Sequence, residues 1–221
     1  MIDIFLTPAY LEVLDAELLS QFIADILLTP TATMRIRSNV SQLIRVPVGD
    51  LIISGIQLEQ VVDVPGLDAF RNPPIDVIRQ DIVGSTETTI IAAAEFNISN
   101  PSIVDGLFTR AVVDMVYMGE VVATSVLPAF DLKKGGNIVS SETVLLPPPD
   151  DKAHEAQHKA FRSFVSNYLV GNSTPVTLTG HADSTPVPLL KKAFSNFRSN
   201  VVVPGTTSPL VINATLDILK W

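Results

Sequence analysis

The chain has 221 residues, of which 47% are apolar and 17% charged, and it contains no Cys. This apolar content supports one large or two small folded domains and excludes disorder caused by low hydrophobicity. The absence of Cys excludes disulfide scaffolds and thiolate metal clusters. Because the formal net charge is −8, most of the surface repels nucleic acid phosphates, and we expect no nucleic-acid partner.

The first residues do not have the pattern of a signal peptide. Residues 1–8 lack a basic segment, and Asp3 and Pro8 interrupt the short apolar stretch. No apolar run in the sequence reaches the roughly 20 residues that a membrane-spanning helix needs. We therefore expect this piece of chain to be soluble, with any membrane anchor supplied by a segment of a longer parent protein.

The predicted secondary structure consists of many short strands and two helices. Apolar residues recur at helical spacing over about 15–28 and about 151–169. Elsewhere apolar and polar residues alternate, which is the period of a strand with one buried face. The predicted strands are 34–38, 43–47, 51–64, 75–83, 89–98, 108–118, 121–127, 137–146, 176–180, 201–203 and 210–219. Helices are too few for repeated βαβ crossovers, so we predict a mainly β, antiparallel fold.

Local residue choices predict where the chain turns. Met118-Gly119-Glu120 suits a tight hairpin, and the glycines at 135 and 136 tolerate a positive φ. At 100–102 the sequence is Asn-Pro-Ser. Asn100 can satisfy a nearby backbone group, and Pro101 fixes φ and ends the strand, so we interpret this element as a corner and not as a binding site.

An internal repeat relates the two helical segments. The apolar positions 18, 19, 22, 23, 26 and 27 match 160, 161, 164, 165, 168 and 169 at a constant offset of 142 residues. The same offset aligns positions 34, 36 and 38 with 176, 178 and 180 in the following strand. After a shift of three residues, the Val-Pro-Gly run at 64–66 aligns with that at 203–205. A helix, two strands and a corner therefore form a repeated unit.

The repeat predicts a tandem domain organisation. Residues 1–72 would be the closing part of a first sandwich, with the helix and its closing strands. Residues 73–208 would form a second, complete sandwich, and 209–221 the opening strand of a further one. On this prediction the chain is a piece of a longer array, and its two repeats superpose helix on helix and strand on strand.

Several elements together resemble one protein family. They are Leu67 after Pro65-Gly66, the strand beginning Ile75-Asp-Val, the corner at 97–102, the hairpin at 117–120, the turn at 132–137, and Gly180 followed by Ser-Thr-Pro at 184–186. Their order and spacing resemble the fungal DUF3712 proteins, which are related in pattern to late-embryogenesis-abundant group 2 (LEA-2) and water-stress-hypersensitivity domains. The resemblance covers nearly the whole chain.

The resemblance implies both a fold and a cellular setting. The implied fold is an immunoglobulin- or fibronectin-like antiparallel β-sandwich with one packed α-helix, repeated along an ectodomain. The implied setting is a membrane-tethered protein behind a single N-terminal span, facing the vacuolar lumen or the cell exterior. The family supplies no catalytic residues that can be carried over to this sequence.

Four sequons fit a secretory-pathway location. The candidate glycosylation sites are Asn39, Asn97, Asn172 and Asn213, each followed by Ser or Thr at the third position. Asn97 and Asn213 fall on the more polar faces of their predicted strands. The alternative is that all four are ordinary polar residues of a cytosolic protein.

One motif has the pattern of a zinc enzyme. His154-Glu155-Ala156-Gln157-His158 reads H-E-x-x-H, which on a helix places two imidazoles on one face beside a glutamate. No Glu follows Glu155 to act as a third ligand, and only His181 and Asp183 remain as candidates. The first repeat has Glu12 and Ala16 at the positions of His154 and His158. We therefore interpret the motif as a solvated helix start and expect no metal and no cofactor.

Three functions remain open at this point. The favoured one is a non-enzymatic structural or interaction module that binds a protein partner through edge strands, loops or the interface between repeats. The second is a carrier of lipid or another apolar ligand, with Phe161, Phe164 and Tyr168 lining a groove instead of the core. The third is a zinc hydrolase acting through His154, Glu155 and His158. An apolar pocket of several hundred Å³ between helix and sheet would favour the carrier.

Overall fold

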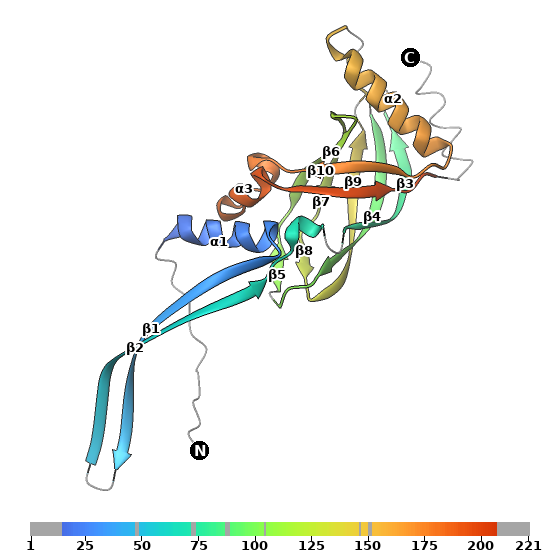
Figure 1. Ribbon diagram of the computed structural model, residues 1–221. Helices are drawn as coiled ribbons and strands as arrows, with labels where there is room; N and C mark the ends of the chain where they lie inside the picture. Colours follow the sequence, from blue (N-terminus) through green and yellow to red (C-terminus); the bar gives the residue numbers. More distant parts are fainter. Residues whose placement is uncertain are drawn as a thin grey trace.

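The structure is a computed structural model that describes residues 15–46, 49–71, 74–86, 89–103, 105–145, 147–149 and 152–206. Figure 1 shows a curled sheet with helices on one side and a strand pair projecting from it. The three α-helices of the described residues are α1 (Ala16–Leu28), α2 (Glu155–Leu169) and α3 (Pro188–Ser195), and the three 3-10 turns are η1 (Asp68–Phe70), η2 (Lys152–His154) and η3 (Ala182–Ser184). The strands are β1 (Thr31–Val46), β2 (Gly49–Pro65), β3 (Asp76–Ser85), β4 (Ile90–Asn100), β5 (Gly106–Phe108), β6 (Ala111–Tyr117), β7 (Glu120–Leu127), β8 (Phe130–Leu132), β9 (Gly135–Leu145), β10 (Thr174–Thr179) and β11 (Arg198–Val203).

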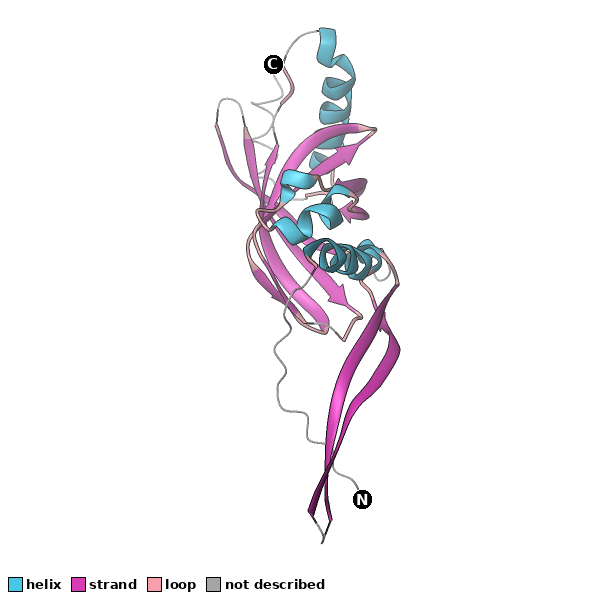
Figure 2. Ribbon diagram, turned by 90° about the vertical axis from the view of Figure 1, so that its left-hand side faces the viewer, coloured by secondary structure: helices cyan, strands magenta, loops and turns pink. Residues whose placement is uncertain are grey.

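The main sheet has seven strands in the order β11-β10-β6-β7-β9-β4-β3. All of its neighbouring strands run antiparallel, which confirms the predicted antiparallel, mainly β fold. The sheet curls, so that β11 and β3, its two edge strands, also contact each other. The short strands β5 and β8 form a separate antiparallel pair. The buried apolar residues of the sheet and the helices form one cluster. Figure 2 shows the helices gathered on one side of the curled sheet.

The alternation of side chains explains strand β4, which lies next to the edge strand β3. Its buried residues are Ile90, Ala92, Ala94, Phe96, Ile98 and Asn100. The residues between them are all more exposed, so the period of two predicted over 89–98 is confirmed. Opposite Ala92 and Ala94 on β9 stand Thr143 and Ser141. Small side chains at this point let the sheet curl closely around its core.

Helix α2 closes the sheet with the stripe that the sequence predicts. Ala160, Phe161, Phe164, Val165, Tyr168 and Leu169 are all buried. The helix contacts β7, β6 and β10. The α-helical part begins at Glu155, after the 3-10 turn η2, and not at residue 151.

Helix α3 is absent from the sequence prediction, which placed no element between 180 and 201. It begins with Pro188 at its first turn, and it buries Ala193 and Phe194. Pro at the first helical position is a recognised start signal because its fixed φ suits the helix and its missing N–H would have no partner there. The prediction missed the helix because its eight residues show barely two turns of periodicity. The expectation of one packed helix per sandwich is therefore incomplete.

The strands β1 and β2 form a long hairpin outside the main sheet. They are antiparallel from Thr31↔Pro65 to Val46↔Gly49, with a bulge between Val40 and Gln42. The sequence predicted two strands, 34–38 and 43–47, where the structure has the single strand β1. The bulge explains the break, because it interrupts the alternation that the prediction used. Both views show the hairpin projecting away from the seven-stranded sheet (Figures 1 and 2).

The predicted turns and corner are confirmed. Met118 and Gly119 connect β6 to β7 with φ of 53° and 86°, as a two-residue hairpin turn with two positive φ values requires. Gly135, the first residue of β9, has a φ of 93°. Asn100 is buried, and its Oδ1 accepts the N–H of Ser102 at 2.9 Å, which closes the corner.

The local unit of helix, strand pair and corner occurs twice with matching contacts. The Leu67 N–H donates to the Ile26 carbonyl at 2.7 Å, and the Thr206 N–H donates to the Tyr168 carbonyl at 2.9 Å. Strand register also agrees, because Ala32 pairs with Val64 and Thr174 pairs with Val203.

The two copies differ in their surroundings. Strand β10 hydrogen-bonds to β6 as well as to β11, whereas β1 and β2 form a sheet of their own. The tandem sandwiches and the domain limits therefore remain predictions.

Candidate functional site

One face of helix α1 packs against segments that follow it in the sequence, including helix α3. Asp15 caps the helix by accepting the Leu18 N–H at 3.0 Å, and Ser20, Ala24 and Leu27 are buried. The Ser20 hydroxyl donates to the Leu189 carbonyl of α3 at 3.0 Å. At the rim, Lys192 Nζ of α3 lies 2.8 Å from a Glu17 carboxylate oxygen. These contacts fix α1, and the hairpin that follows it, against the end of the curled sheet.

Among the described residues, the other apolar face of α1 is only partly covered. Leu18 is 68% exposed, and Leu19, Phe22 and Ile26 are only half-buried. We call these four residues the open face of α1. Their equivalents at +142 on α2, namely Ala160, Phe161, Phe164 and Tyr168, are all 5% exposed or less. The two helices have the same apolar pattern, but this face is more exposed on α1 than on α2. Helix α2 contacts β7, β6 and β10, whereas at the end of the α1 face Ile26 lines the groove beside Leu107 and Leu132 of the β5–β8 pair.

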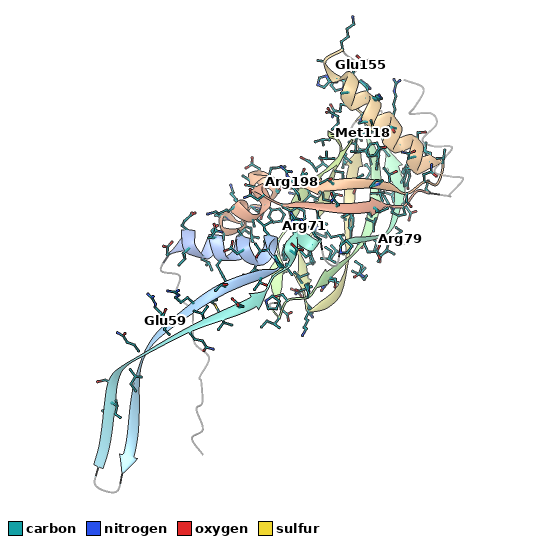
Figure 3. The ribbon with its side chains drawn as sticks, in the orientation of Figure 1. Glu59, Arg71, Arg79, Met118, Glu155 and Arg198 are labelled. Atoms are coloured by element: carbon teal, nitrogen blue, oxygen red, sulfur yellow. The ribbon has the colours of Figure 1, made fainter. Side chains whose placement is uncertain are left out.

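The hairpin adjoining the open face presents charged and apolar side chains to solvent. Arg35 and Arg37 on β1 each have a guanidinium nitrogen 3.4 Å from a Glu59 carboxylate oxygen on β2. All three side chains are at least half exposed, so each ion pair is worth little on its own. Ile52 and Val61 are also more than half exposed. Glu59 is labelled on the projecting strand in Figure 3.

Two apolar spaces lie near the junction of α1 with the sheet. One is a cavity of about 40 Å³ in the core, lined by side chains that include Leu28, Phe70, Phe108 and Phe194. The other is a groove of about 170 Å³ between α1 and the β5–β8 pair, lined by Ile23, Leu107 and Leu132 among others. Ligand sites typically hold about 300 to 1,000 Å³. Both volumes fall below the several hundred Å³ that an apolar-ligand carrier would need.

The proposed groove residues of α2 lie in the core. Phe164 is 1% exposed and packs beside Tyr117, with 6.0 Å between ring centroids. The Tyr168 hydroxyl donates to the Gln80 carbonyl of β3 at 2.6 Å. Burial raises the pKa of this phenol, a hydrogen bond with Thr206 opposes the rise, and the negative charge of Asp81 adds to it. These aromatic side chains therefore fasten α2 to the sheet.

The H-E-x-x-H residues stand at the outer start of α2. His154 is the residue before the helix, Glu155 is exposed, and His158 Nε2 donates to the Pro149 carbonyl at 2.7 Å. Figure 3 shows Glu155 at the tip of the molecule. His181 lies instead beside Asp114, with 3.9 Å between Nε2 and Oδ2. Among the described residues, no group of three or more His, Cys, Asp or Glu side chains could hold a metal ion.

The four sequons differ in their surroundings. Asn172 is exposed in the turn between α2 and β10. Asn97 is half-buried on β4, where its Oδ1 lies against Gly136 of β9. The backbone of Asn39 lies in β1, but its side chain is outside the described residues. Asn213 and the predicted strand 210–219 are also outside them, as are residues 1–14.

The open face was missed by the sequence analysis, although its residues were named in the repeat. Apolar periodicity reports that a helix has a face to bury, and it does not report whether the partner surface is present. Only the comparison of exposure between α1 and α2 reveals the difference.

The structure is that of an antiparallel, mainly β protein, with helix α1 and the β1–β2 hairpin attached to its main sheet. Comparison with known proteins gives one family match. Residues 3–105 match the family model described as "Protein of unknown function (DUF3712)". The resemblance to DUF3712 stated from the sequence is thereby confirmed over these residues, and its extension over nearly the whole chain stays a prediction. The matched segment covers α1, β1, β2, β3 and β4, and so includes both the open face and the hairpin.

Neither the curated proteins nor the solved structures contain a significant match to the chain. Within the described residues, no helix has the length and apolar character needed to cross a membrane.

Proposed function

We propose that the chain is a non-enzymatic β-sheet module with a structural or protein-interaction role. Its setting is a fungal, membrane-tethered protein of tandem LEA-2-like sandwiches that faces the vacuolar lumen or the cell exterior. The membrane anchor belongs to a segment of the parent protein outside this sequence. The sequons and the DUF3712 match support this setting, and Asn172, exposed in its turn, is the sequon best placed to carry a glycan.

One observation carries the proposal. Among the described residues, the chain holds a partly exposed apolar helix face, with Leu18 68% exposed, and a long hairpin outside the main sheet whose side chains are mostly exposed. Exposed apolar surface and open strand edges are what protein partners use for docking. The small volumes near α1 support this role over lipid carriage, and the His158 contact with Pro149 supports it over zinc hydrolysis.

The test compares three forms of the full chain in extracts of its native cells. The first is unchanged, the second replaces residues 37–59 with an Asn-Gly turn, and the third carries Leu18→Glu on the open face. We expect the unchanged chain to retain protein partners that at least one variant loses. Equal retention by all three forms would contradict the interaction role.

Native mass spectrometry of the purified chain provides the second readout. We expect the mass of the polypeptide with or without glycan, and no lipid or zinc in stoichiometric amount. A co-purifying lipid that leaves on unfolding would replace the proposal with the carrier. One zinc ion that is lost on His158→Ala would replace it with the hydrolase.

A further inference from the structure

The repeated unit occurs twice in this chain. The second copy packs against the strand pair β6–β7, and the first copy has no equivalent strand pair among the described residues. In the second copy, β10 pairs with β6 through Thr177↔Val116, Leu178↔Met115 and Thr179↔Asp114. Helix α2 of the same copy lies on β7 and β6. The strand pair β6–β7 therefore supports both the helix face and the strand edge of the unit.

In the first copy, the same two surfaces are open. The offset of 142 places Arg35, Ile36 and Arg37 of β1 at the positions of 177–179. Across the part of the chain that the structure describes, β1 pairs with β2 alone. On the open face of α1, Leu18 is exposed and the other three residues are half-buried, whereas their α2 equivalents are all buried. Within the described residues, two independent features, a strand edge and a helix face, thus lack the strand pair that their counterparts in the second copy contact.

We propose that the open face of α1 and the edge of β1 at residues 35–37 bind a pair of strands equivalent to β6 and β7. The strand pair comes from a second DUF3712 sandwich that lacks its own closing helix and strands. A second intact copy of this chain does not offer such a pair, because its β6 edge already binds β10 and its β6–β7 surface already carries α2. The inference rests on the proposed interaction role and names the partner for it.

Charge complementarity supports this partner and fixes its register. Arg37 occupies the position of Thr179, which pairs directly with Asp114. A partner strand with an Asp at that position places a carboxylate opposite Arg37. Opposite charges on directly paired residues stabilise an antiparallel strand pair, and a register shift of two residues separates them.

The experiment supplies the partner on the same polypeptide. A copy of residues 67–149, which spans η1 and β3–β9, is placed ahead of residue 1 of the full chain, so that linkage gives it a high effective concentration. The chain has no native Cys, so a single engineered pair can report the register. Arg35→Cys is combined with Val116→Cys in the added copy, and the matched control combines Arg37→Cys with the same Val116→Cys.

We expect a disulfide in the Arg35–Val116 pair and none in the control, which is two residues out of register on the same face of β1. Disulfide formation requires Cβ atoms about 3.5 to 4.5 Å apart, so it distinguishes the two registers. Leu18→Glu should abolish the disulfide, and Ala16→Glu, an equal charge on an exposed position of α1 outside the open face, should preserve it. Neither variant should shift the Tm of the unextended chain.

Equal disulfide yields in both Cys pairs, or no disulfide while circular dichroism shows the added copy folded, would overturn the inference. An added copy that stays unfolded beside α1 would overturn it as well, because the open face should complete that copy. If cellular partners still require Leu18 in either case, the proposed interaction role stands and only this partner is wrong.

Discussion

Gly66 and Gly205 show how a single residue holds each corner of the repeat. A Cβ at Gly66 would collide with the Thr29 carbonyl oxygen, and a Cβ at Gly205 would collide with the backbone of Gly171. Neither glycine has a positive φ, so close approach of the backbone, and not conformation, explains both. The two positions align at the offset of 139 that the Val-Pro-Gly runs define.

We predict that Gly66→Ala and Gly205→Ala each lower the free energy of unfolding by about 1 to 3 kcal/mol, because backbone atoms must move to admit the methyl group. Gly106→Ala is the matched control, since nothing lies within 4 Å of its Cβ position. It should stay within about 0.5 kcal/mol of the unchanged chain. Urea unfolding monitored by circular dichroism measures all three, and an equal loss at Gly106 would contradict this explanation.

Tyr168 predicts a pH dependence of stability. Burial raises the pKa of its phenol in the folded chain above the ordinary value of 10.0. The unfolded chain therefore loses this proton at a lower pH than the folded chain, so stability falls as the pH rises above about 10 and continues to fall until the folded pKa is passed. Tyr168→Phe should make this fall shallower, as urea midpoints at pH 9 and pH 11 would show.

The same substitution tests the hydrogen bond to Gln80. At neutral pH, Tyr168→Phe should cost about 1 to 2 kcal/mol, because the buried Gln80 carbonyl loses its hydroxyl donor. Tyr10 and Tyr117 are present in both forms and act as the internal control for alkaline pH. An unchanged pH slope in the variant would show that Tyr168 is not responsible for the alkaline loss.

At the scale of elements, α1 and α2 make a matched pair. Phe164→Ala on α2 should cost about 3 to 5 kcal/mol, because this side chain is 1% exposed within the core. Phe22→Ala occupies the equivalent place on α1, where the side chain is half-buried on the open face. It should cost about 1 kcal/mol or less. Similar losses at both positions, measured by urea unfolding, would mean that the face of α1 is covered in the isolated chain.

The sequence predicts strands and turns well where one local rule decides them. The alternation in β4, the glycine at 119 and the Asn100 corner each depend on a few neighbouring residues. Helix α3 is too short to show its period, and the bulge in β1 interrupts the alternation. The zinc-like motif at His154 shows a limit of local patterns, because residue spacing says nothing about whether a third ligand is near. The openness of α1 depends on what surrounds it, which no local pattern records.

The projecting hairpin should be separable from the fold. Its described side chains beyond Met34 and Val62 are mostly exposed, and they contribute little to the core. Replacing residues 37–59 with an Asn-Gly turn keeps the pairing of Ile36 with Gln60 and supplies a two-residue hairpin connection. We expect the Tm to change by no more than a few degrees in a thermal scan followed by circular dichroism. A loss of cooperative unfolding would show that the distal hairpin supports the sheet.

At the scale of the whole molecule, the contacts of α1 determine whether the protein unfolds as one cooperative unit or as several. Leu27 is buried in the same apolar cluster as Phe70 and Phe194, and Ser20 bonds to α3. A helix that shares the core of the main sheet should open only when that sheet opens. We therefore predict one cooperative unit that contains α1, the corner at Leu67 and the seven-stranded sheet.

Native-state hydrogen exchange followed by mass spectrometry checks this prediction. Amides of α1 should exchange with the same free energy as those of α2, whereas the hairpin amides at 40–57 should exchange through local opening at a much lower free energy. Leu27→Ala should then weaken protection in β4 and β9 as much as in α1, because all of them belong to one unit. If α1 lost protection alone, α1 and the hairpin would form an independent unit, and the sheet would be complete without them.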